Sequence, residues 1–149
     1  MAQISRSPIW RENVSRAVLG TFAGIVMAFV VVLGIEMIGM QLFPPPAGMD
    51  ALNPESVRQH LSEIHVGSYV VVVLAWSLAA FAGPFVARLI AGSSANWPAL
   101  VVIALFAAMC AYNLIIIPSP RWLIPVAIIA VGTASMLGFR TRFGAPRPA

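Results

Sequence analysis

The sequence contains no lysine, and charged side chains of either sign are rare. Only 9% of its 149 residues are charged, whereas soluble domains carry about 25%. Hydrophobic residues make up 60% of the chain, which is more apolar surface than a soluble core could hide. The composition therefore excludes an ordinary soluble domain and predicts an integral membrane protein.

The sequence also has little of what catalysis and metal binding require. Its single cysteine, Cys110, lies inside an apolar run and has no partner for an intrachain disulfide. The two histidines, His60 and His65, are five residues apart, a spacing that places side chains on different faces of a helix. The Cys, His, Asp and Glu residues do not show the ligand spacing of a metal site. We therefore expect no enzyme activity, no metal and no cofactor.

The positive charge comes entirely from arginine, and nine arginines against five acids give a formal net charge of +4. A basic balance can indicate nucleic-acid binding, but these arginines lie at the ends of apolar runs. That placement is typical of topology signals and of contacts with lipid headgroups. We therefore expect the lipid bilayer as a partner, and no nucleic acid.

Four apolar runs are long enough to cross the hydrocarbon core of a bilayer, which takes about 20 helical residues. The first is too long for the apolar core of a signal peptide and ends at three prolines, so it predicts an uncleaved helix. The expected fold is all-α, a four-transmembrane-helix bundle that forms a single integral membrane domain over residues 1–149. The four spans are expected at about 17–43, 67–92, 98–117 and 122–139.

The first loop contains a helix start. Asn53 is a favourable cap and Pro54 suits the first turn. Val57, Leu61 and Ile64 then follow at helical spacing, with polar residues between them. We expect a short amphipathic helix on the membrane surface, with a solvated connector helix as the alternative.

Small residues recur at every fourth position of the second run. In lipid, helices associate where small side chains let their backbones come close. The second run is therefore expected to be the helix against which the others pack. The predicted packing positions, together with two in the first run, are Gly20, Gly24, Ala75, Ala79, Gly83, Ala87 and Ala91.

The arginines also predict the orientation, because cytoplasmic loops carry an excess of positive charge. Arg58 and Arg121 lie on one side of the expected membrane, and the other seven arginines lie on the opposite side. Both termini are therefore expected in the cytoplasm, with the loop at 44–66 outside. On the assumption of a bacterial source, the location is the inner membrane. The seven arginines are Arg6, Arg11, Arg16, Arg88, Arg140, Arg142 and Arg147.

Glu36 is the only acid inside an apolar run. It precedes Pro44 by eight residues, about 12 Å of helix, and so lies in the outer leaflet. A carboxylate that faced lipid would be unfavourable, so we expect Glu36 to point inward and to form a hydrogen bond with a neighbour at similar depth. Its role is either a clamp between helices or a solute- or proton-binding group. The candidate polar site is Glu36, Asn113, Tyr112, Ser68, Tyr69 and Arg121.

Three stretches resemble a group of uncharacterised small four-span bacterial inner-membrane proteins. They are EMIGMQLFPPPAGMD at 36–50, GPFVARLIAG at 83–92 and NLIIIPSPRW at 113–122. The resemblance implies the four-span architecture and assigns no site residue.

The expected function is that of a structural or accessory subunit that packs against other membrane helices, as a homo-oligomer or within a larger complex. The alternative is an oligomeric transporter or channel for a small solute or proton, with Glu36 in an outward-facing cavity. A pathway through one chain is not expected, because the inner half offers only hydroxyls, which commonly bond to their own helix. These hydroxyls are Thr21, Ser77, Thr133 and Ser135.

Overall fold

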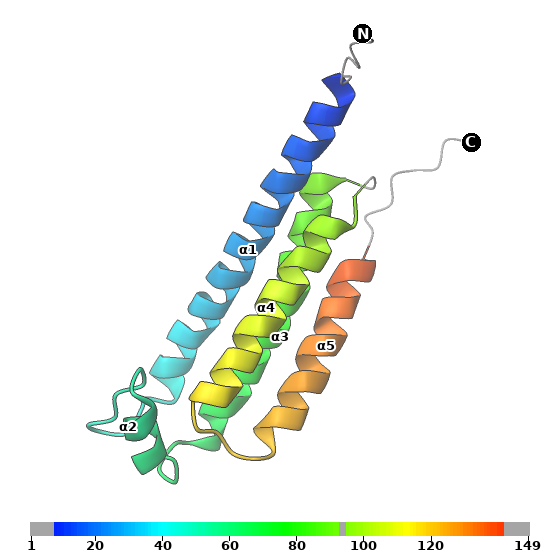
Figure 1. Cartoon of the computed structure of the whole chain (residues 1–149). Helices are drawn as coiled ribbons and strands as arrows, with labels where there is room; N and C mark the ends of the chain where they lie inside the picture. The colour runs from blue at the N-terminus through cyan, green and yellow to red at the C-terminus, as the bar shows by residue number, and fades with distance from the viewer. Residues whose placement is uncertain (1–7, 93–94, 142–149) are drawn as a thin grey trace.

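The computed structural model describes residues 8–92 and 95–141. It confirms the predicted all-helical fold, because four packed helices are long and apolar enough to cross a membrane (Figure 1). The predicted topology signals Arg6, Arg142 and Arg147 lie outside the described residues. The helices are α1 (Pro8–Leu42), α2 (Pro54–Gln59), α3 (Val66–Ala91), α4 (Trp97–Ile116) and α5 (Leu123–Arg140).

The four long helices begin and end within two residues of the predicted spans, except at the start of α1. This helix begins at Pro8, well before the expected start at residue 17. The polar segment that precedes the apolar run contains no glycine or internal proline that would break a helix, and Pro8 suits a first turn. The helix therefore extends beyond the length that a bilayer requires.

The helices run alternately up and down, so α1 begins and α5 ends at the same end of the bundle (Figure 1). The opposite end carries the long α1–α3 loop (residues 43–65), which contains α2, and the short turn between α4 and α5. We call this opposite end the loop end.

Helix α3 lies at the centre of the bundle and contacts α1, α4 and α5. Its row of small residues faces these neighbours: Ala75, Ala79 and Ala87 are fully buried, and Gly83 and Ala91 are also buried. In contrast, α4 and α5 contact each other only slightly. The small-residue row thus forms the centre of the helix packing, as its spacing predicts.

Two neighbours approach the backbone of α3 closely in the half of the bundle away from the loop end. A Cβ placed on Gly20 of α1 would lie only 2.6 Å from the carbonyl oxygen of Ala87. On the other side, Gly138 of α5 lies directly against the backbone of Phe81. Glycine permits both approaches because it has no side chain between the backbones.

The loop helix α2 is present but shorter than expected. Asn53 caps it as predicted, because its Oδ1 accepts a hydrogen bond from the Glu55 N–H at 3.0 Å. The helix ends at Gln59, so Leu61 and Ile64 lie in the turns that follow. These turns lead the chain back to the start of α3, which a continuing straight helix would not do.

Candidate functional site

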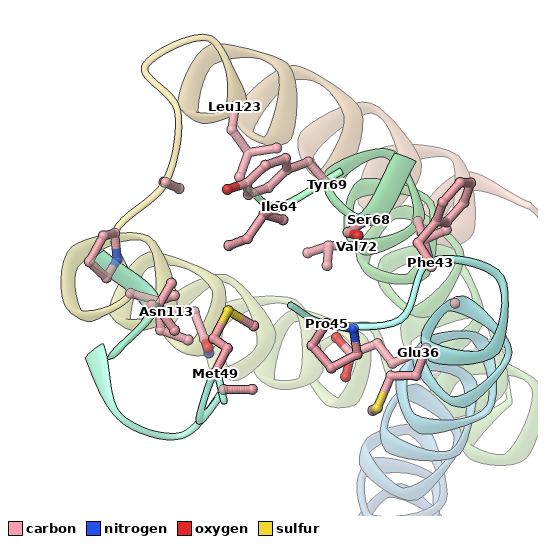
Figure 2. Close-up of a pocket in the computed structure, with 18 of the residues that line it drawn as sticks. Glu36, Phe43, Pro45, Met49, Ile64, Ser68, Tyr69, Val72, Asn113 and Leu123 are labelled. Atoms are coloured by element: carbon pink, nitrogen blue, oxygen red, sulfur yellow. The ribbon is translucent and has the colours of Figure 1, made fainter. Parts of the chain in front are cut away.

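A cavity of about 310 Å³ lies at the loop end of the bundle (Figure 2). Helices α1, α3 and α4 provide its walls, and Leu123 at the start of α5 also contributes. Apolar residues of the α1–α3 loop complete the lining, among them Pro45, Met49 and Ile64. The cavity is mostly apolar, and its polar lining side chains are Glu36, Ser68, Tyr69, Asn113 and Ser119.

Glu36 is half-buried on α1 and extends into this cavity (Figure 2). It lies six residues before the end of the helix at Leu42, about 9 Å along the helix axis. The inward direction therefore agrees with the expectation from the sequence.

The predicted hydrogen bond of Glu36 is not formed. None of the hydrogen bonds and ion pairs among the described residues involves its carboxylate. The Asn113 amide instead donates to the carbonyl oxygen of Met109, one turn back on α4, at 3.0 Å. Because the amide is satisfied by its own helix, the structure contains no clamp between Glu36 and Asn113.

Two of the six predicted site residues lie outside the cavity. Tyr112 is 64% exposed on α4, because neighbouring residues on a helix point about 100° apart and its neighbour Asn113 faces inward. Arg121 is exposed in the turn before α5. Similar depth in the membrane therefore did not place these two side chains beside Glu36.

Tyr69 of α3 presents an unpaired hydroxyl to the site. Its ring packs edge-on against Trp122, with 6.1 Å between ring centroids and an interplanar angle of 84°. Its hydroxyl oxygen is buried and has no hydrogen-bond partner among the described residues. Buried polar atoms are usually paired, so this hydroxyl has an unsatisfied capacity for a hydrogen bond.

A stacked pair of rings closes the base of the α1–α3 loop. The rings of Phe43 and His65 are nearly parallel, with 4.9 Å between their centroids. His65 also caps α3, where its Nδ1 accepts a hydrogen bond from the Gly67 N–H at 3.0 Å. A Cβ on Gly67 would lie 2.5 Å from the Phe43 ring, so a side chain there would displace this ring. These contacts hold the loop over the cavity.

Residues of the α1–α3 loop belong to the site, although no pattern in the sequence predicted this. Val57 and Ile64 line the cavity although they belong to the amphipathic helix that was expected to lie on the membrane surface, and Met49 from the loop before that helix lines it as well. The apolar character of these three residues was the available signal. The aromatic residues Phe43 and Trp76, which also line the cavity, could not be separated from ordinary packing residues.

The chemistry of the site is that of binding. In the described part of the chain, no three His, Cys, Asp or Glu side chains lie close enough to hold a metal ion. One carboxylate, one amide and three hydroxyls in an apolar setting can orient a ligand by charge and hydrogen bonds.

A second, larger space lies between α4 and α5. This groove of about 670 Å³ follows from the slight contact between the two helices. Small residues line it on both sides, including Ala107 and Ala111 of α4 and Gly132 of α5. We call this space the α4–α5 groove.

Comparisons with protein-family models, with curated proteins and with solved structures found no match for this chain.

Proposed function

We propose that this protein is an accessory subunit of a membrane complex, and that its α4–α5 groove receives a transmembrane helix of a partner membrane protein. The observation that carries the proposal is a set of small residues in that groove that the described part of the chain leaves exposed. The proposed complex lies in a bacterial inner membrane, with both termini of this protein in the cytoplasm.

The small residues of the groove differ from those of α3. Ala75, Ala79 and Ala87 are buried by neighbouring helices, whereas Ala107 and Ala111 are exposed. A Cβ placed on Gly132 would meet no atom within 4 Å. Because small residues let helix backbones approach in lipid, the groove presents a packing surface that this chain leaves unfilled.

The shape of the groove also favours a helix as its occupant. It runs between two long helices, from Leu100 and Phe139 to Ile115 and Ile124. These limits cover most of the length of α4 and α5. The buried Ser135 offers a hydroxyl on its wall, and polar contacts of this kind support helix association in membranes.

The alternative, an oligomeric transporter or channel, is favoured by the cavity that contains Glu36. Two of the four hydroxyls in the opposite half bond to their own helices in the described residues. Thr21 donates to the Ala17 carbonyl at 3.0 Å and Ser77 to the Val73 carbonyl at 2.7 Å. A transport pathway would therefore have to form between copies of the chain, which makes it the second candidate.

Substitution in the groove tests the proposal. Gly132→Leu places a bulky side chain in the groove at a position where a Cβ meets nothing within 4 Å, and Gly34→Leu is a matched control because a Cβ at Gly34 also meets nothing within 4 Å. The tagged native protein is purified from its own membranes in mild detergent, and its co-purifying membrane proteins are identified. We expect a partner that is lost in Gly132→Leu and retained in Gly34→Leu.

Two results would overturn the proposal. One is a native protein that purifies only with itself, as a small homo-oligomer, which together with solute flux in liposomes would favour the transporter. The other is a partner that Gly132→Leu retains in full.

A further inference from the structure

We propose that the cavity at the loop end binds a small amphipathic amine, with its ammonium group at Glu36 and a second polar group at Tyr69. This inference goes beyond the accessory role and does not depend on it, because the cavity and the α4–α5 groove share only Leu114 among their lining residues.

Glu36 has no partner of opposite charge among the described residues. A half-buried carboxylate without a hydrogen bond has lost part of its hydration and gained no partner in return. Arg88, the basic residue of α3, is already engaged elsewhere, since it donates to the Phe139 carbonyl oxygen. His65 stacks on Phe43 and caps α3. A cationic ligand would provide the missing partner.

The size and the lining of the cavity indicate which kind of cation would bind there. The cavity is at the lower end of the range of about 300–1,000 Å³ that is typical of small-molecule sites. Most of its lining is apolar, and the rings of Phe43, Tyr69 and Trp76 contribute to it. A hydrated metal ion needs polar partners for its waters, whereas an organic ammonium gains from aromatic faces. The lining therefore favours an organic cation.

The Tyr69 hydroxyl is a second polar group, on the far side of the cavity from Glu36 (Figure 2). Figure 2 shows the Tyr69 hydroxyl and Glu36 on opposite sides, with Val72 and Ile64 between them. The hydroxyl is buried and unpaired, so it would gain from a hydrogen bond with a ligand. A molecule with polar groups at both ends and an apolar middle satisfies both side chains together.

Three related probes test this arrangement. Tyramine carries an ammonium and a hydroxyl at opposite ends of an aromatic ring, phenethylamine lacks the hydroxyl, and 4-ethylphenol lacks the ammonium. Binding to the full chain in nanodiscs of zwitterionic lipid is measured by calorimetry. We expect tyramine to bind about tenfold more tightly than phenethylamine, and 4-ethylphenol to bind more weakly than either.

Two variants assign the ends of the ligand. Glu36→Gln keeps the shape of the side chain and should weaken tyramine binding at least tenfold, whereas the control Glu63→Gln, at an exposed acid in the α1–α3 loop, should change it less than twofold. Tyr69→Phe removes only the unpaired hydroxyl and should remove the preference of tyramine over phenethylamine.

Three outcomes would overturn the proposal. They are binding of tyramine that Glu36→Gln leaves unchanged, equal binding of tyramine and 4-ethylphenol, and no binding of any probe. Thermal unfolding of each variant in the same nanodiscs serves as the folding check. If Glu36→Gln does not fold, the Tyr69→Phe comparison of tyramine with phenethylamine still decides.

Discussion

Gly24 of α1 and Gly83 of α3 face each other closely, so that a side chain at Gly24 would meet the backbone of α3 and one at Gly83 would be tightly confined. A Cβ on Gly24 would lie 2.6 Å from the Gly83 carbonyl oxygen, and a Cβ on Gly83 would lie 3.1 Å from the Gly24 carbonyl oxygen. Close backbone contact of this kind is the main source of helix association in lipid, where apolar burial contributes little. The pair therefore holds the most extensive interface in the bundle, that between α1 and α3.

The Gly24 contact predicts opposite effects for the same substitution at two glycines of α1. Gly24→Ala should destabilise the bundle by about 1–3 kcal/mol, because the new methyl group meets backbone. Gly34→Ala should be neutral or stabilise it by up to about 1 kcal/mol, because a Cβ there meets nothing and alanine favours helix. Unfolding in mixed micelles with increasing denaturing detergent measures both. Equal stability of the two variants would contradict the close contact.

Arg88 is predicted to hold the end of α5 against α3. Its guanidinium donates to the Phe139 carbonyl oxygen and lies over the Phe139 ring, 4.8 Å from the centroid. Arg88→Met keeps the length of the side chain but removes both interactions, and should cost about 1–3 kcal/mol. Arg140→Met, an exposed neighbour, should cost much less. The same unfolding assay compares the two variants. If Arg140→Met lowered the stability more than Arg88→Met, the Arg88 contact would not have the predicted importance.

Much of this fold could be predicted because its signals are local in the sequence. The length of each apolar run predicts a span, and the spacing of Ala75, Ala79 and Gly83 predicts the face of α3 that is buried. The start of α1 at Pro8 was missed because apolar length reports where lipid begins and carries no information on where a helix begins.

The candidate site was predictable only in part. Depth along the helices selected Glu36 and Asn113, and both line the loop-end cavity. Depth does not determine the direction in which a side chain points, and Tyr112, which was selected in the same way, is exposed on α4 instead. The predicted hydrogen bond between Glu36 and Asn113 is not formed, because the Asn113 amide bonds to its own helix instead. The contribution of Met49 and Ile64 depends on how the loop folds back, which no local pattern shows.

The topology is predicted by the arginines and can be tested at two exposed positions. Ala51 lies in the α1–α3 loop and Asn96 lies at the opposite end, just before α4. In a Cys110→Ala background, a cysteine at Ala51 should react with a membrane-impermeant thiol reagent added outside intact cells. A cysteine at Asn96 should react only after the membrane is opened. The reverse pattern would mean that the termini lie outside.

Site-specific photocrosslinking in the native membrane tests most directly whether the α4–α5 groove holds a partner helix. A diazirine side chain is placed at Met136, which lines the groove, or at Met37 on α1; the native side chains are 50% and 63% exposed. We expect illumination to link the Met136 position to one membrane protein other than this chain, and the Met37 position to lipid. Crosslinks from Met136 to lipid alone, or only to a second copy of this chain, would contradict the accessory role.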